Sequence, residues 1–256
     1  MQKEMMMKKL ILLSLVFLFT VPTVSYAVGM ELAIGGCNQS PQGDISYKSD
    51  DLLDLKSDLK YDSEFRIMGR LKLDIPVFPN IYLMTTQTEF DGTGRKSGDF
   101  EFGDKVFKGN TDFYSQLTLH NYDIALYYGI PLVGLVSLGT FNIDVGLNLR
   151  VIDFKTEVRQ DDINNAESKS GTLPVPMLYV AARFRPIEGL TAEAELRGVT
   201  YSDNHLYSLI GRVKAEVFGP LFVAGGYRYE SIFFDEEDVE IETSFNGPFF
   251  EAGFQF

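Results

Sequence analysis

The last ten residues of the chain, Gly247 to Phe256, restrict the possible folds more than any other segment. Apolar residues occupy every second position of this segment: Pro248, Phe250, Ala252, Phe254 and Phe256. Most of the positions between them hold polar or small residues. A period of two places the apolar side chains on one face of a β-strand. A two-faced strand that ends on phenylalanine is typical of the closing strand of an outer-membrane β-barrel, with the last ring in the aromatic girdle at the periplasmic interface.

The first 27 residues predict a cleaved signal peptide. Lysines precede the apolar run Leu10 to Thr20, which is too short to span a bilayer as a helix. Small residues at Ser25 and Ala27 place the expected cleavage after Ala27. A transmembrane anchor is the alternative interpretation of this run. We therefore expect a signal peptide at 1–27 and one barrel domain at 28–256.

Charge and cysteine content exclude several classes of function. Residues 1–27 carry three lysines and one glutamate, so their removal lowers the net charge from −13 to −15. An acidic chain without a basic patch is not expected to bind nucleic acid. Cys37 is the one cysteine, so no internal disulfide forms, and no pattern in the sequence indicates a cofactor or a dedicated metal site.

Ten segments alternate between apolar and polar residues and are separated by turn residues, which is typical of membrane-spanning barrel strands. The phase of the fifth slips near Ile152, which predicts a β-bulge there. The segments are 28–37, 64–75, 81–90, 112–128, 140 to about 157, 172–185, 190–201, 205–217, 221 to about 233, and 247–256.

We therefore predict an all-β fold, a closed antiparallel transmembrane barrel of about ten strands, in the outer membrane of a Gram-negative bacterium. An even number of strands puts both termini on the periplasmic side. On this count, longer acidic connections follow the first, third, fifth and ninth strands. A barrel of eight strands is the alternative, and a soluble periplasmic carrier resembling a lipocalin is a further one.

If the apolar residues face lipid, the charged residues of the strands face the interior. A barrel of this size is nearly filled by side chains, so ion pairs are expected to plug the lumen. A narrow, gated polar path is the alternative. Glu31, Asp123 and Glu251 have the same parity as the following predicted network: Arg66, Arg70, Lys72, Asp74, Asp144, Arg150, Arg183, Arg185, Glu193, Glu195, Arg197, Arg212, Lys214, Glu216, Arg228 and Glu230.

Short motifs stand in order along the chain and resemble those of a known family. They are Gly35-Gly36, Gly43 to Tyr47, Tyr127 to Pro131, Pro174 to Met177, Ala224 to Glu230 and the terminal phenylalanine. The chain resembles a family of outer-membrane β-barrel proteins named for a Gly-Gly pair near the mature N-terminus. Family members carry an aromatic residue after the pair, where this chain has Cys37. The family has no assigned activity, so the resemblance implies the fold and the location.

The sequence gives no catalytic residues. His120 and Asp123 are three apart, and so are His205 and Ser208, so each pair lies on opposite faces of a strand. Neither pair matches the histidine–serine or histidine–aspartate arrangements of barrel hydrolases. We therefore predict a structural protein or a narrow passive channel without catalysis. The alternatives are a lipid-modifying enzyme and a carrier of small hydrophobic molecules.

Two acidic segments have several interpretations. In Asp50 to Lys60, leucines 52, 55 and 59 have roughly helical spacing, which predicts an amphipathic helix across the barrel mouth, a cap over an apolar cavity, or a solvated loop. Asp235 to Asp238 is a candidate for weak binding of divalent cations. The other expected partners are outer-membrane lipids, lipopolysaccharide, and the barrel-assembly machinery, which would read Phe250, Phe254 and Phe256.

Overall fold

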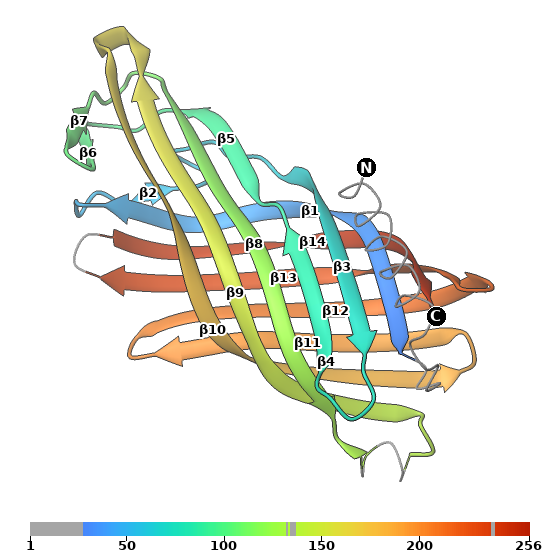
Figure 1. Cartoon of the computed structure of the whole chain (residues 1–256). Coiled ribbons are helices and arrows are strands. Elements are labelled where there is room, and N and C mark those ends of the chain that lie inside the picture. Colours follow the sequence, from blue (N-terminus) through green and yellow to red (C-terminus); the bar gives the residue numbers. More distant parts are fainter. Residues whose placement is uncertain (1–27, 132, 134–136, 237–238) are drawn as a thin grey trace, which may run out of the picture.

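The computed structural model describes residues 28–131, 133, 137–236 and 239–256, and the expected signal peptide lies outside them. Strands form a closed antiparallel barrel (Figure 1). Ten strands form the ring, with β4 (Asn80–Thr86) and β5 (Glu89–Gly94) counted as one strand. The others are β1 (Gly29–Tyr47), β3 (Glu64–Asp74), β8 (Phe113–Gly129), β9 (Phe141–Gln160), β10 (Asn165–Ile187), β11 (Leu190–Tyr201), β12 (Asn204–Phe218), β13 (Leu221–Glu236) and β14 (Val239–Gln255).

The barrel closes because the last strand pairs with the first. Leu32 lies opposite Phe254, and Tyr47 lies opposite Val239. Around the ring the order is β1, β3, β4, β8, β9, β10, β11, β12, β13 and β14. The prediction of a ten-stranded barrel is confirmed, and the alternative of eight strands is wrong. Both ends of the barrel domain lie at the same rim, because Met30 exchanges backbone hydrogen bonds with Phe256.

Small elements lie at the opposite, outer rim. Between β1 and β3 is β2 (Leu53–Asp54), and between β5 and β8 is a hairpin of β6 (Phe100–Phe102) and β7 (Lys105–Phe107). A single 3₁₀ turn, η1 (Asp161–Ile163), connects β9 to β10. No helix among the described residues has the length and apolar character needed to cross a membrane.

Several strands are longer than the sequence indicates. Residues expected to form an acidic connection after the fifth segment instead extend β9 to Gln160 and begin β10 at Asn165. Along the extension of β9 the alternation continues with its faces exchanged, because charged residues such as Lys155 and Arg159 lie on the outer face and Ile152 and Val158 are buried inside. The cross-strand pairing of β9 with β10 is continuous, from Asn165 opposite Gln160 to Phe184 opposite Phe141.

The bulge predicted near Ile152 is absent, since the pairing of β9 with β8 and β10 runs through this position without a shift. Ile152 is apolar because it faces an apolar part of the interior, where it is 5% exposed. Register shifts occur instead between Phe184 and Ile187 and between Glu216 and Phe218, at the rim that holds the termini.

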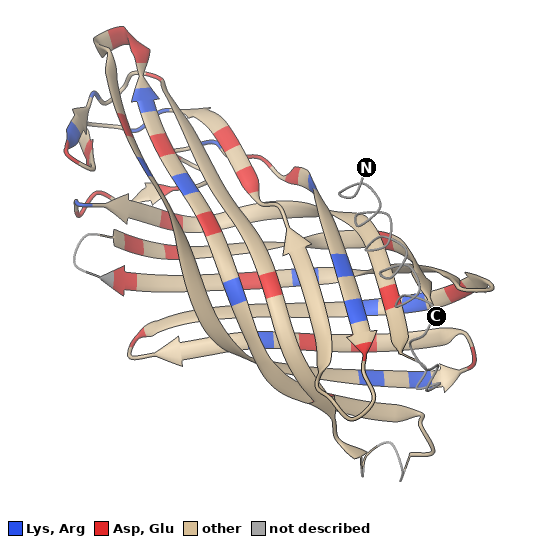
Figure 2. Ribbon diagram, in the orientation of Figure 1, with Lys and Arg blue, Asp and Glu red and all other residues tan. Residues whose placement is uncertain are grey.

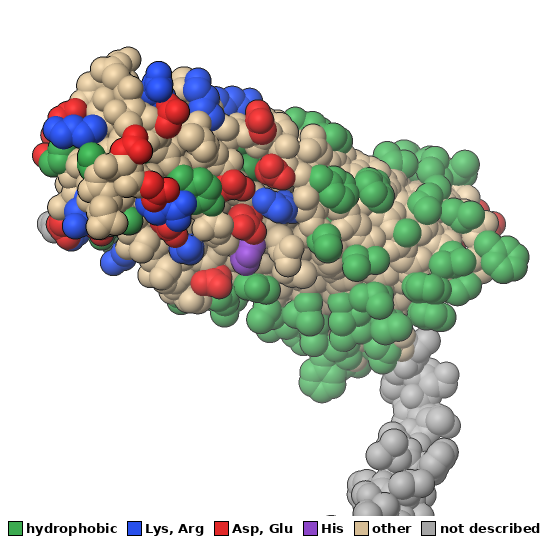
Figure 3. Space-filling view, turned by 90° about the horizontal axis from the view of Figure 1, so that it is seen from above, with side chains coloured by type: hydrophobic (Ala, Val, Ile, Leu, Met, Phe, Trp, Pro, Cys, Tyr) green, Lys and Arg blue, Asp and Glu red, His purple; other side chains and the backbone are tan. Residues whose placement is uncertain are grey.

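Apolar side chains cover the outside of the lower half of the barrel. Ile34, Leu147 and Phe250 are 68%, 67% and 63% exposed. Figure 3 shows such side chains gathered toward one end of the molecule, with charged side chains toward the other. On β8 the outward residues Tyr122 to Tyr128 alternate with buried ones. An exposed apolar belt of this kind is suited to contact with lipid.

Candidate functional site: a closed lumen

The interior has two zones, and charged side chains fill the lower one. Figure 2 shows both signs of charge interspersed along the strands. Of the predicted network, the following are buried: Arg70, Lys72, Asp144, Arg150, Glu193, Glu195, Arg197, Arg212, Lys214, Arg228 and Glu230. Glu31, Asp123 and Glu251 are buried with them. The buried charged residues balance, because seven are basic and seven are acidic.

One cluster crosses the full width of the lumen. Lys72 Nζ on β3 lies 3.2 Å from both Glu193 Oε2 and Glu195 Oε1 on β11. Five places separate β3 from β11 in the ring of ten, so these strands face each other. Arg212 Nη1 on β12 contacts the same two carboxylates at 2.9 and 2.5 Å. The axis of the barrel is therefore occupied at this level.

A second cluster crosses the lumen one layer above. Arg150 donates to both carboxylate oxygens of Asp123, with distances of 2.9 Å from Nε and from Nη2, and its Nη1 lies 2.9 Å from Glu230 Oε2. The Asn121 amide on β8 donates to Glu230 Oε1 at 3.0 Å on β13, the strand opposite. The bidentate geometry of Arg150 on Asp123 is the strong form of an arginine–carboxylate pair.

A third cluster joins the first and last strands. Arg70 on β3 pairs with Glu31 on β1, and its Nη2 lies 2.7 Å from Glu251 Oε1 on β14. Lys214 Nζ on β12 contacts Glu31 Oε2 at 2.5 Å. These pairs join strands that only barrel closure brings together.

Aromatic rings fill the space that the ion pairs leave. Fully buried Arg197 lies with its guanidinium 4.8 Å from the ring centroid of Tyr82 and 5.2 Å from that of Tyr179. These cation–π contacts stabilise a charge held away from water. The charge pattern alone did not indicate these tyrosines, although Tyr82, Tyr127 and Tyr179 are buried at inward-facing positions of their strands.

Five predicted members are not fully buried. Arg66 is partly exposed and donates to the Glu89 carbonyl oxygen, and exposed Asp74 accepts a hydrogen bond from the Tyr127 hydroxyl at 3.1 Å. Arg185 and Glu216 are exposed because each lies next to a register shift at the lower rim, where the alternation of faces ends. Arg183 is only partly buried and pairs with Asp144 at 3.0 Å.

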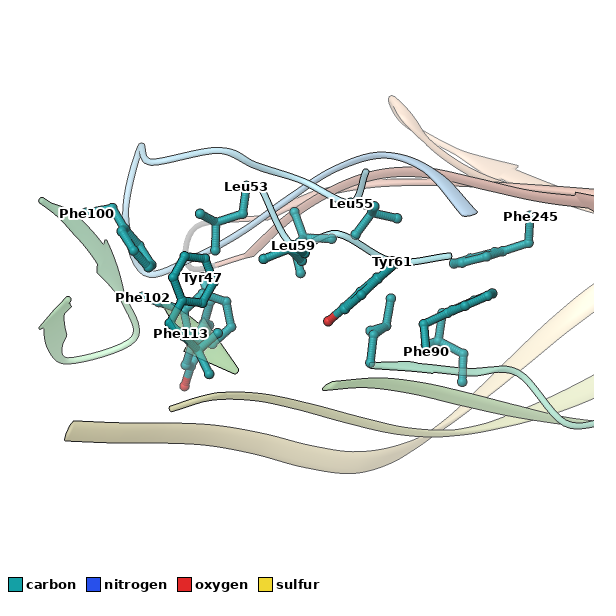
Figure 4. Packing of buried hydrophobic residues seen from close by; sticks show 14 of the residues in the cluster. Tyr47, Leu53, Leu55, Leu59, Tyr61, Phe90, Phe100, Phe102, Phe113 and Phe245 are labelled. Atoms are coloured by element: carbon teal, nitrogen blue, oxygen red, sulfur yellow. The ribbon is translucent and has the colours of Figure 1, made fainter. Parts of the chain in front are cut away.

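The upper zone is apolar and aromatic. Figure 4 shows rings and leucines packed together inside the outer mouth. Phe90 stacks on Phe245 with ring centroids 5.6 Å apart, and Phe100 packs against Phe107 at 5.3 Å and Phe113 at 4.9 Å. No pattern of alternation indicated this zone, because most of its residues come from the connections and from strand ends above the membrane.

The segment Asp50 to Lys60 closes this zone, but not as a helix. It forms β2 and turns. Leu53, Leu55 and Leu59 are completely buried, whereas Leu52, which helical spacing placed on the apolar face, is 43% exposed. The helix and the solvated loop are therefore both wrong, and the leucines pack onto the aromatic residues beneath them.

Backbone hydrogen bonds to carboxylates order this segment. Burial disfavours the charged form of Asp54, but the N–H groups of Ser57 and Lys56 donate to its carboxylate and hold its pKa below the ordinary value. Asp58 Oδ2 accepts the Asp54 N–H at 3.1 Å. These bonds fold the acidic residues back onto their own backbone.

The structure gives each histidine a neighbour other than Asp123 or Ser208. His205 stacks on Tyr207 and Phe233 at centroid distances of 5.1 and 5.6 Å. Strand register places Asp153 directly beside His120, a neighbour that spacing along the chain could not indicate because it lies on another strand. His120 Nδ1 has no hydrogen-bond partner among the described residues.

Within the described part of the chain, no group of three or more histidine, cysteine, aspartate or glutamate side chains has the arrangement of a metal site. The acidic candidate Asp235 to Asp238 lies partly outside the described residues. At the end of the chain, Phe254 and Phe256 stack with their centroids 6.4 Å apart, and Phe250 is 63% exposed on the outer face.

Comparison with solved structures finds outer-membrane proteins, of which the first supports the fold. The outer membrane protease OmpT of Escherichia coli is 10% identical to this chain with a TM-score of 0.55, over 89% of this chain and 97% of that one. The translocator domain of the autotransporter NalP from Neisseria meningitidis is 8% identical with a TM-score of 0.45, over 90% and 87%. The Ail protein of Yersinia pestis is 8% identical with a TM-score of 0.39, over 90% and 99%.

No protein-family model matches the chain, and no curated protein matches it significantly. The likeness to OmpT shows the fold alone, because the sequences are so different. The chain is an integral outer-membrane β-barrel of the kind found in Gram-negative bacteria.

Proposed function

We propose that this barrel is a structural protein of the outer membrane that neither conducts solutes nor catalyses a reaction. The observation that carries the proposal is that side chains of facing strands contact each other across the lumen. Lys72 reaches from β3 to Glu193 on β11, and Asn121 reaches from β8 to Glu230 on β13. A solute moving along the axis would have to separate both contacts.

The cost of uncompensated buried charge favours a closed state over the narrow path. Removing one partner of a buried ion pair costs about 3–5 kcal/mol, because the remaining charge lies in a poorly solvating interior. The aromatic zone adds a second barrier in series, with Leu53, Leu55 and Leu59 completely buried across the mouth. Near Cys37 and Arg228 the packing leaves no room for a water molecule.

Planar-bilayer recording tests the proposal. Purified wild-type protein is expected to insert without producing discrete conductance steps. The variant that combines Lys72→Ala, Glu193→Ala, Asn121→Ala and Glu230→Ala with deletion of residues 53–61 removes both bridges and the outer seal, and serves as the open control. Reproducible single-channel steps from the wild-type protein would establish the narrow path and overturn the proposal.

The proposal includes several features of maturation and environment. Removal of residues 1–27 leaves Val28 as the mature N-terminus, which mass spectrometry of protein from outer membranes would test. Phe250, Phe254 and Phe256 act as the signal read by the barrel-assembly machinery, and lipopolysaccharide surrounds the outer rim. Membership of the Gly-Gly family is part of the same proposal, supported by the motifs between Gly35 and Glu230.

Absence of catalysis is supported by the surroundings of the histidines. His205 is packed between aromatic rings, and Ser208, which is completely buried, belongs to the interior. Loss of a measurable activity in a His120→Ala, His205→Ala variant that still folds would favour an enzyme instead.

A further inference from the structure

One edge of β10 is unpaired above the membrane. β10 pairs with β9 from Asn165 to Phe184, but among the described strands it pairs with β11 only from Leu178 onward. Thirteen residues of β10, 165–177, precede this second pairing, whereas β11 continues for only three residues after Gly198, the partner of Leu178. β10 therefore runs on well past the tip of the β11–β12 hairpin, as Figure 1 shows.

Two prolines end the pairing with β11. Successive residues of an antiparallel strand turn their N–H and C=O groups alternately toward its two neighbours. The Arg185 N–H donates to the Thr140 carbonyl oxygen at 2.7 Å, on the side of β9, so the odd-numbered residues of β10 hydrogen-bond with β9. The even-numbered residues face β11, and among them Pro174 and Pro176 have no N–H to donate. The ladder to β11 therefore stops next to these prolines.

Beyond the prolines, β10 can accept another strand. Ser168, Ser170 and Thr172 are exposed, have short side chains, and direct their N–H and C=O groups away from β9. No described strand pairs with that side of β10 at these residues. Such an edge is a template for an added strand, and natural sheets usually protect it with proline, charge or a bulge. In β10 proline is confined to the part next to β11, and residues 168–172, here called the open edge, keep their N–H groups.

Apolar side chains beside the open edge are incompletely covered. Leu173 and Tyr201 lie at inward-facing positions of their strands, yet they are 46% and 79% exposed. The Phe154 ring lies over Gly171, where a Cβ atom would be 2.9 Å from it, and this ring is only partly buried. A strand added at the open edge would turn every second side chain inward onto these residues. The added strand is therefore expected to be apolar at alternate positions.

The turns around the open edge are acidic. Asp162 lies in η1, just before β10, Asp203 lies at the tip of the β11–β12 hairpin, and Asp235 lies near the end of β13. All three side chains are exposed. An added strand with basic residues at its ends would complement these carboxylates.

A second copy of the chain in the same membrane does not fit the open edge. The strands of a barrel tilt by about 35–45° from the barrel axis. Two upright barrels related by a twofold axis along the membrane normal would therefore present edges that cross at about 70–90°, twice the tilt. Strands that cross at such an angle cannot form a ladder of hydrogen bonds, so the occupant is a segment of a different protein.

We infer that the open edge of β10 is a docking site for an extended segment of a partner protein, which adds to the sheet as an antiparallel strand. Apolar side chains of the segment cover Leu173 and Tyr201, polar ones lie outward beside Ser170, and basic residues at its ends lie near the acidic turns. The inference goes beyond the proposed function, because the segment binds above the membrane while the lumen stays closed.

Fluorescence anisotropy of a labelled peptide tests the site. The probe is a nine-residue peptide in which threonine and valine alternate between terminal lysines. The full barrel in lipid nanodiscs is compared with empty nanodiscs, and we expect saturable binding of one peptide for each barrel.

Two N-methylated forms of the peptide test whether the main chain makes the contact. In antiparallel pairing with valines inward, the threonines lie opposite Ser168, Ser170 and Thr172 and exchange hydrogen bonds with them, whereas the valine N–H groups point away. Methylating three threonine nitrogens should weaken binding at least about tenfold, and methylating three valine nitrogens should change it by less than about threefold. Equal affinities of the two methylated peptides would overturn the inference.

Variants of the barrel test the same contact from the other side. Ser170→Pro removes one N–H from the open edge and leaves the ladder to β9 intact, so it should weaken binding about tenfold, whereas Ser170→Ala keeps the N–H and should bind normally. Leu173→Ser reduces the apolar contact and should weaken binding about fivefold, which keeps the test decisive if the proline impairs folding. Unchanged affinity in Leu173→Ser and in a folded Ser170→Pro variant would contradict the inference, and so would a barrel that dimerises without peptide through this edge.

Discussion

Replacing Arg150 with methionine gives the sharpest test of the closed interior. The Arg150 side chain is completely buried, and its three nitrogens contact Asp123 and Glu230 at 2.9 Å each. Removing the cation leaves two buried carboxylates without it, which costs about 3–5 kcal/mol. The ratio of folded to unfolded protein should therefore fall about 150- to 4,000-fold, since each 1.4 kcal/mol is a factor of ten.

The assay is urea unfolding of the refolded barrel in detergent micelles, followed by heat-modifiable migration on a gel. The matched control is Arg95→Met, which removes the same charge from a pair 2.8 Å long whose side chains are 60% and 63% exposed. That change should cost less than about 1 kcal/mol. A double variant, Arg150→Met with Asp123→Asn, should recover much of the loss because it removes the carboxylate left uncompensated, whereas Glu230 keeps its pair with Arg228 at 2.6 Å. Equal midpoints for Arg150→Met and Arg95→Met would refute the account of a dry, ion-paired lumen.

Two further perturbations test the packing of residues 53–61 against β5. Gly94→Ala puts a Cβ atom 2.0 Å from the Asp58 carbonyl oxygen and should destabilise the protein by about 1–3 kcal/mol, whereas Gly211→Ala, with no atom within 4 Å, should be tolerated; urea midpoints compare them. The pKa of Asp54 is lowered in the folded protein, so its stabilising effect is complete above the ordinary value of about 4 and is lost as the pH falls through the lower, folded value. Pepsin should therefore cut residues 53–61 faster as the pH drops below about 4. The Asp54→Asn variant should be cut readily with little dependence on pH, because it lacks the ionisable carboxylate. Identical pH profiles of cleavage for the wild-type protein and the variant would contradict this.

Much of the barrel could be predicted from the sequence, because lipid imposes a strict period of two. Leu190–Tyr201 was predicted with the bounds that β11 has, and the other spans lie within or near their strands. The identity of the apolar face changes where lipid no longer acts. In β9 above the membrane, charged residues such as Lys155 and Arg159 lie outside and apolar Val158 lies inside, so a strand continues that a lipid-facing pattern does not indicate.

Parity also assigned most of the interior charges, but it did not select their partners. Lys72 and Glu193 are far apart in the sequence, and only closure of the ring places β3 opposite β11. The conformation of residues 53–61 was harder still to predict, since the spacing of leucines 52, 55 and 59 suggests a helix. Its conformation depends on the glycines of β5 and on Gly43, which lie outside the segment itself.

The most direct test of the account compares two alanines on neighbouring strands. Ala181 on β10 is 2% exposed and faces the interior, whereas Ala194 on β11 is exposed on the outer face. Each is changed to cysteine in a Cys37→Ser background, and a pyrene maleimide dissolved in the bilayer is applied to the reconstituted protein. The account predicts rapid labelling of Ala194→Cys and protection of Ala181→Cys. Labelling of Ala181→Cys with protection of Ala194→Cys would contradict the assignment of lipid and lumen faces.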